Sequence, residues 1–227
     1  MKALLAALLV LIPATGFGQR TAANAPDSVL GKLGIGLDRP HEVVAQIDKL
    51  TQGSEPPPIR NVGEAAAVVG HVVERLKHNR FQIPEFHVSV NDSKEINAYA
   101  QADLKQITIP IGIVRFLRAD EGELAFVIAH EIGHIQDRQC HEIAEHARIT
   151  QEGQSRLCEQ RADALGLQYL VGAGYNPYDA AAFFGRLLMY GGGATVLDTL
   201  LGRMASDHPV DLDRINNLRK VQKALLD

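Results

Sequence analysis

The first hydrophobic run of the chain is short and lies at its amino end. Residues 3–12 form an unbroken apolar run behind Met1-Lys2. A settled transmembrane helix needs about 20 apolar residues, so this run is too short. A basic start, a short apolar core and small residues behind it are typical of a secretory signal peptide. We expect residues 1–18 to be removed, with cleavage as late as about residue 25, and the protein to reach the periplasm or the cell exterior. An N-terminal membrane anchor is the less favoured alternative.

The middle of the chain shows two periodicities. Apolar residues recur every three to four positions over about 61–79, as on the buried face of a helix, and a shorter helix is expected over about 40–51. Apolar and polar residues then alternate, which is typical of half-buried strands. The predicted strands cover about 86–90, 96–101 and 106–111. Short strands that follow each other closely favour a small three-stranded antiparallel sheet.

The second half of the chain has a helical pattern. Asp120 and Glu123 form a capping box, which predicts the start of a helix that should run to about Ala147. Gly191-Gly192-Gly193 predicts a flexible break further on. Other helices are predicted over about 154–171, 177–190, 195–203 and 210–226. The pattern predicts a mostly helical α+β fold in a single domain over residues 26–227.

Composition and charge exclude some classes of protein. The chain has 46% hydrophobic and 22% charged residues, which is typical of a globular protein rather than a disordered one. Its formal net charge is -4, it has no strongly basic patch, and it contains no Trp. These features argue against nucleic acid as a partner.

The segment His130-Glu131-Ile132-Gly133-His134 lies inside an apolar helical stretch. Histidines four residues apart lie on one helix face, one turn apart, which lets both imidazoles bind one zinc ion. Glu131 is rotated away from that direction and is placed to act as general base toward a water molecule. Two helix histidines without a metal are the alternative. Polar groups in an apolar helix need partners, however, and a metal ion supplies one.

The third ligand is predicted in the following helix. Glu159 and Asp163 are four residues apart and therefore share a helix face. Glu159 is the predicted ligand, and Asp163 is placed to accept an N–H from a ligand histidine. An ordinary solvated helix face is the weaker alternative. Three protein ligands with one open position are typical of a catalytic zinc site, so we expect one Zn²⁺ per chain.

The two cysteines of the chain flank this predicted site. Oxidation after export would join Cys140 to Cys158 and would tie the histidine helix to the glutamate helix. Two unpaired thiols are equally consistent with the sequence. The disulfide and the free thiols therefore remain alternatives.

A later polar segment supplies a further candidate residue. His208-Pro209 follows the glycine-rich break and precedes the last predicted helix, which contains Arg214. An imidazole that reaches the metal site from this segment could stabilise an oxyanion. A loop histidine beside a capping aspartate is the alternative.

Together these motifs resemble one family of peptidases. The chain resembles the gluzincin peptidases of the forty-eighth metallopeptidase family, which includes CAAX prenyl proteases, membrane heat-shock proteases and periplasmic peptidases of outer-membrane quality control. The resemblance spans about residues 60–220. The matching segments are Asn97-Ala98-Tyr99-Ala100, His130-Glu131-Ile132-Gly133-His134 with Arg138, Glu159-Gln160-Arg161-Ala162-Asp163 with Leu165-Gly166, Ala173-Gly174-Tyr175-Asn176-Pro177, and His208-Pro209 with Arg214-Ile215.

The resemblance implies a zincin-like fold with an active-site helix, and it implies hydrolysis of peptide bonds. It implies that His208 contacts the substrate or the oxyanion, which makes Glu131 and His208 the expected catalytic pair. It also implies that Arg214 joins an internal salt bridge. The strand at residues 97–100 resembles the edge along which the substrate backbone lies, as when an extended peptide adds to a sheet.

Departures from the family narrow the expected function. Gln139 follows Arg138, where many members have a histidine, and the sequence shows neither transmembrane helices nor a helical-repeat domain. Prenylated substrates and repeat-mediated docking are therefore not expected. We expect a zinc-dependent endopeptidase of envelope protein quality control that acts on unfolded or misfolded polypeptides and contacts the membrane or envelope assembly machinery peripherally. The alternative is a gated, chaperone-like zinc protein whose site is covered by residues 191–208.

Overall fold

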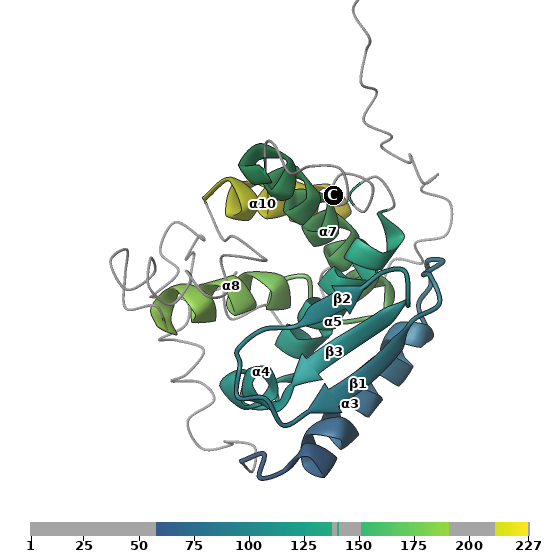
Figure 1. Cartoon of the computed structure of the whole chain (residues 1–227). Helices are drawn as coiled ribbons and strands as arrows, with labels where there is room; N and C mark the ends of the chain where they lie inside the picture. The colour runs from purple at the N-terminus through teal and green to yellow at the C-terminus, as the bar shows by residue number, and fades with distance from the viewer. Residues whose placement is uncertain (1–57, 138–139, 141–150, 191–211, 227) are drawn as a thin grey trace, which may run out of the picture. The chain divides into compact units, whose positions relative to one another are not determined.

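The structure, a computed structural model, describes residues 58–137, 140, 151–190 and 212–226 (Figure 1). All of them belong to the unit that covers Gly36–Asp227. The predicted signal peptide, the predicted helices at 40–51 and 195–203, the glycine-rich break and His208 lie outside the described residues. No helix in the described part of the chain has both the length and the apolar character needed to cross a membrane.

A helix and a small sheet come first along the chain, and helices follow (Figure 1). The elements are α3 (Val62–Lys77), β1 (His87–Asn91), β2 (Tyr99–Gln101), β3 (Gln106–Pro110), α4 (Ile111–Phe116), α5 (Glu121–Gln136), α7 (Gln151–Gly172), α8 (Asp179–Tyr190) and α10 (Leu212–Leu226). The predicted fold class, mostly helical α+β, is confirmed.

The sheet is mixed, so the prediction of an antiparallel sheet is wrong. The strand order is β1-β3-β2, with β1 parallel and β2 antiparallel to β3 (Figure 1). Ile107 of β3 lies opposite Val88 on one side and Ala100 on the other. The segment between β1 and β2 places β2 two strand positions away from β1, which leaves room for β3 between them. The chain then turns back after β2, so β3 runs antiparallel to β2 and parallel to β1 in the middle of the sheet.

The core forms where the sheet meets the helices. Ile107 and Ile109 lie on the buried face of β3, whereas Gln106 and Thr108, which point to the other face, are half-buried. Helix α3 packs against β1 and α5, and α5 also packs against β2. Leu76 of α3 and Phe126 of α5 are likewise buried in this core. Apolar residues thus surround α5 along most of its length, and this burial fixes the helix that carries the histidines.

Helix α5 starts where the sequence predicts and ends earlier. The Asp120 carboxylate accepts a hydrogen bond from the Glu123 N–H at 2.9 Å, which confirms the predicted cap. The helix ends at Gln136, and Asp137, with φ -85° and ψ 81°, leaves the helical conformation. The prediction that this helix continues to Ala147 is therefore wrong. The Asp137 carboxylate instead lies 3.2 Å from the Arg161 guanidinium of α7, so an ion pair joins this end of the helix to α7.

Two glycines let α5 and α7 approach closely. A Cβ atom on Gly133 would lie 2.8 Å from the Ala162 carbonyl oxygen, and one on Gly166 would lie 2.9 Å from the His130 backbone nitrogen. Both distances are shorter than ordinary contacts to a Cβ atom. The two backbones therefore lie nearer to each other than side chains would allow at these points. This contact sets the distance between the histidines on α5 and the carboxylates on α7.

Candidate metal centre

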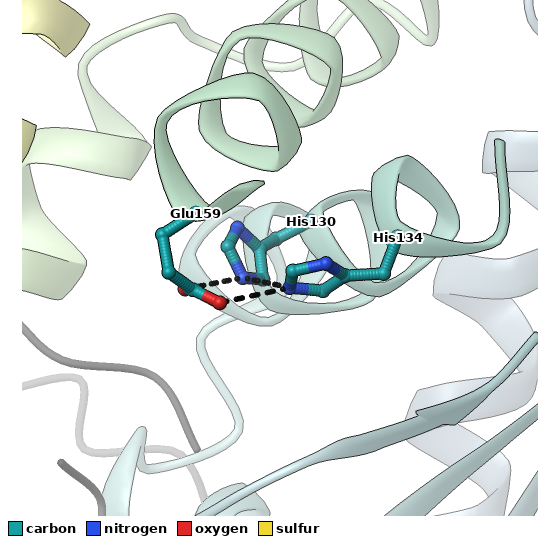
Figure 2. A group of neighbouring side chains, drawn as sticks. All are labelled: His130, His134 and Glu159. Carbon is teal, nitrogen blue, oxygen red and sulfur yellow. Dashed lines mark hydrogen bonds and ion pairs between the residues drawn. The ribbon is translucent and has the colours of Figure 1, made fainter. Parts of the chain in front are cut away.

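Three predicted ligands meet at one point. His130 and His134 project from the same face of α5, and Glu159 faces them from α7 (Figure 2). The Nε2 atoms of His130 and His134 are 3.0 Å apart. The Glu159 carboxylate oxygens lie 3.4 Å from His130 Nε2 and 3.3 Å from His134 Nε2. Two histidines one helix turn apart and a glutamate from a different helix thus bring three donor groups together.

These spacings fit a zinc ion. In a tetrahedral site with zinc–ligand bonds of roughly 2.0–2.1 Å, neighbouring ligand atoms are roughly 3.3–3.4 Å apart. The two imidazole nitrogens are 3.0 Å apart, and each lies 3.3–3.4 Å from one of the two Glu159 carboxylate oxygens, close to that value. Two imidazole nitrogens and a carboxylate oxygen are also a donor set that zinc prefers. The group is therefore consistent with one zinc ion per chain.

Asp163 orients the first histidine from behind. Its Oδ1 atom lies 2.9 Å from His130 Nδ1, on the side of the ring away from Glu159 and His134. A proton shared between Nδ1 and this carboxylate leaves Nε2 as the nitrogen that faces the other ligand atoms. Carboxylate partners of this kind fix the tautomer and the ring angle of metal-binding histidines.

Arg214 of α10 neutralises the two acidic groups of α7. Its guanidinium donates two hydrogen bonds to Asp163, at 2.8 and 2.7 Å, and Nη1 lies 2.9 Å from Glu159 Oε2. All three side chains are buried. A buried carboxylate is stable only when it is paired and hydrogen-bonded, so Arg214 allows both carboxylates to remain charged beside the histidines.

The electrostatics of the ligand group favour a cation. Burial disfavours a charged His130, but the hydrogen bonds and negative charges of Asp163 and Glu159 outweigh it and raise the pKa of His130 to about 10. Burial lowers the pKa of His134, and the neighbouring His130 adds to that effect. Burial of Asp163 is outweighed by Arg214, which lowers the pKa of that carboxyl. In the metal-free protein His130 therefore carries a second ring proton, which a divalent cation displaces when it binds there.

Glu131 lies beside the ligands and borders a mostly apolar pocket. The side chain of Glu131 is 2% exposed and stands on α5 between the two histidines in sequence. The aromatic rings of Phe126, Phe183 and Phe184 lie 5.5–5.8 Å apart around one side of the pocket. The pocket is lined by Asn97, Ala98, Ile113, Phe126, Val127, His130, Glu131, Phe183, Phe184, Leu187 and Arg214.

The pocket connects the ligand group to the predicted substrate strand. Asn97 and Ala98 lie directly before β2, and both are buried in the pocket wall. Tyr99 and Ala100 belong to β2, which has β3 as its one neighbour among the described strands. The predicted edge strand therefore lies beside the groups that carry the chemistry.

The two cysteines form a disulfide next to the third ligand. Cys140, just beyond the end of α5, is bonded to Cys158 in α7. Cys158 directly precedes Glu159 in the chain. The bond therefore joins the end of the histidine helix to the turn of α7 that carries the glutamate.

Several residues around the site were missed from the sequence. The wall formed by Phe183, Phe184 and Leu187 comes from α8, and Ile113 comes from the short helix α4, which was not predicted. The apolar face of α8 was visible as a helical pattern in the sequence. That pattern indicates that the face is buried, but it does not indicate which part of the protein the face contacts. His208 lies outside the described residues, so its expected role is not addressed by the geometry.

A buried helix with two zinc-spaced histidines, a glutamate between them and a carboxylate from a second helix define a zinc metallopeptidase site. Comparison with known families agrees. The sequence pattern of Peptidase family M48 matches residues 63–150 and 139–222, which together cover more than half of the chain. The protein therefore belongs to peptidase family M48 and is a metalloendopeptidase with a His-His-Glu zinc centre. A search of curated proteins gave no match.

Proposed function

We propose that the protein cleaves unfolded or misfolded polypeptides in the cell envelope. The observation that carries the hydrolytic part is the convergence of His130, His134 and Glu159 beside the buried Glu131. The envelope part is supported by the signal-like N-terminus and by the Cys140–Cys158 disulfide, since disulfides persist in oxidising compartments.

The residues around the centre divide the reaction between them. Zinc held by His130, His134 and Glu159 would supply Lewis acidity toward water and a carbonyl group. Glu131 takes the proton from the attacking water and then passes it to the leaving amine. Asp163 and Arg214 hold His130 and Glu159 in place while these proton transfers occur. His208, by its resemblance to the family pattern, is proposed to donate a hydrogen bond to the oxyanion.

The substrate is proposed to bind as an extended strand. An extended peptide can add its backbone to the edge of β2, next to the ligand group, in the manner of strand addition. The mostly apolar pocket beside Glu131 would then receive an apolar side chain of the peptide. Extended segments with exposed apolar side chains are features of unfolded chains, which supports a preference for unfolded proteins over folded ones.

Replacement of the general base tests the hydrolytic mechanism. The Glu131→Gln variant should keep its zinc but lose hydrolysis of an unfolded protein such as casein by about two to four orders of magnitude, the size of a general-base contribution. Glu121→Gln is a matched control, because it removes a partly exposed carboxylate from the start of the same helix. Zinc content and cleavage are measured on the same samples. Wild-type cleavage by the Glu131→Gln variant would refute the assigned role.

The location is tested by the N-terminus of the mature protein. The proposal predicts that protein recovered from the cell envelope starts between about residues 19 and 26, as determined by mass spectrometry of its N-terminal peptide. Recovery of the protein only from the cytoplasm, with Met1 still present, would contradict an envelope function.

A further inference from the structure

The disulfide occupies a position from which it can act on the zinc ligand. Cys158 and Glu159 are consecutive residues of α7, and Glu159 lies roughly two turns after the start of that helix at Gln151. The first turns of a helix lack part of their backbone hydrogen bonds and fray more readily than its middle. A ligand in this part of α7 depends on contacts that hold the helix start against α5.

The contacts between α5 and α7 are uneven along α7. The close backbone contacts at Gly133 and Gly166 hold α7 from Ala162 onward, on the far side of Glu159 from the helix start. On the near side, the Cys140–Cys158 bond joins the two helices covalently. The Asp137–Arg161 ion pair attaches two residues beyond Glu159, and the Arg161 side chain is 42% exposed, so this pair contributes little to holding the helix start. The disulfide is therefore a covalent tie between the two helices on that side of the ligand.

We propose that the Cys140–Cys158 disulfide is a redox-sensitive clamp that holds Glu159 against His130 and His134, so that reduction weakens zinc binding. With the bond intact, α7 presents the Glu159 carboxylate in a fixed position and little conformational entropy is lost when zinc binds. After reduction, the start of α7 frays and this position has to be re-formed at each binding event. Arg214 still contacts Glu159 at 2.9 Å, so affinity falls without being abolished.

The chemical step is an ordinary thiol–disulfide exchange. A reducing protein dithiol supplies two electrons and two protons, the Cys140–Cys158 bond breaks, and the dithiol becomes a disulfide. The Cys158 side of the bond is only partly buried, so a reductant can reach it from solvent. The clamp would keep the peptidase loaded with zinc in an oxidising compartment and would weaken its hold on zinc in a reducing one.

The test measures zinc affinity rather than cleavage, so its outcome is independent of the proposed substrates. The full chain is titrated with zinc against a chromophoric chelator, with and without a phosphine reductant, which breaks disulfides without adding a zinc-binding thiol. We expect reduction to raise the dissociation constant for zinc by about tenfold or more, the range found when supporting contacts of a metal site are removed. An unchanged or tighter affinity after complete reduction, verified by thiol titration, would overturn the proposal.

A variant without the cysteines separates the clamp from side effects of the reductant. The Cys140→Ser/Cys158→Ser protein should bind zinc as weakly as the reduced wild type, and the phosphine should not change its affinity. Hydrogen exchange of the metal-free protein should rise on reduction in the α7 segment before Ala162 and stay unchanged in α3. A rise of equal size in both helices would show general destabilisation and would contradict a local clamp.

Discussion

At the scale of single residues, the metal centre is a set of buried charges that stabilise one another. Glu159 and Asp163 are both buried, and Arg214 bonds to both from α10. Burying a charge is costly, and loss of one partner leaves the others without compensation. Zinc held by His130, His134 and Glu159 would add further positive charge beside Glu159. The stability of the metal-free protein should therefore depend on Arg214 more strongly than that of the zinc-bound protein.

The Arg214→Ala variant tests this dependence. Its free energy of unfolding without zinc should fall by about 3–5 kcal/mol, because two buried carboxylates lose their cation. Zinc should recover part of that loss, and zinc affinity should also fall because Glu159 is less well held. Urea denaturation with zinc and with chelator measures both effects. Arg186→Ala is the matched control, since it breaks a buried pair with Glu123 away from the metal and should leave zinc affinity unchanged. Equal effects of the two variants on zinc affinity would contradict the role of Arg214.

Asp179 predicts a pH dependence of stability outside the metal centre. Its burial, together with the charges of Asp120 and Glu123, raises the pKa of Asp179 to about 7 from an ordinary value of 3.8. Between these two values the unfolded chain releases the proton and the folded chain keeps it, so Asp179 destabilises the fold increasingly as pH rises. Asp179→Asn should therefore leave stability unchanged near pH 4 and raise it by about 1–3 kcal/mol at pH 8. Denaturant unfolding at the two pH values measures this. A gain confined to acidic pH would contradict the assignment.

The sequence predicts the ligand residues well because helix spacing is a local property. His130 and His134 share a face through their four-residue separation, and Glu159 and Asp163 do so for the same reason. The contact of Arg214 with both carboxylates is different, because it joins helices far apart in the chain. Such a contact depends on how helices pack, and only resemblance to a family pointed to a salt bridge of Arg214.

At the scale of secondary-structure elements, the crossing of α5 and α7 sets the geometry of the centre. Gly133→Ala should push the Ala162 backbone away, and Gly166→Ala should push against His130. Each should cost about 1–3 kcal/mol of folding stability, as overpacking does, and should lower zinc affinity because the donor atoms separate. Thermal unfolding and zinc titration measure the two effects.

Gly70→Ala is the control for the glycine substitutions. A Cβ at this position in α3 has no atom within 4 Å, so the substitution should stabilise the helix by up to about 1 kcal/mol and leave zinc binding unchanged. If Gly133→Ala or Gly166→Ala behaved like Gly70→Ala, close approach of the helices would not govern the centre.

Most element bounds were predicted to within about three residues, whereas the end of α5 and the strand pairing were not. The Asp120 cap marks the start of α5 through a local hydrogen bond, and the structure confirms it. The end of α5 at Gln136 has no glycine or proline to mark it, so the local sequence did not predict it. The parallel pairing of β1 with β3 likewise depends on the path of the chain between β1 and β2 rather than on alternation within the strands.

At the scale of the whole molecule, the described helices and the small sheet serve to bring distant segments to one centre. The ligands come from α5 and α7, and Arg214, which pairs with the Glu159 carboxylate, comes from α10. The pocket wall includes residues of α4, α8 and the segment before β2. The match to peptidase family M48 covers the same stretch of chain. Metal binding and folding are therefore coupled, because the centre exists only when these elements are packed.

The most direct test of this account is the position of zinc in a crystal of the zinc-loaded protein, from anomalous scattering at the zinc absorption edge. The account predicts one peak per chain, about 2.0–2.2 Å from His130 Nε2, His134 Nε2 and a Glu159 carboxylate oxygen, with no fourth protein ligand. A peak bound elsewhere, or one at this group closed by a fourth side chain, would contradict the account.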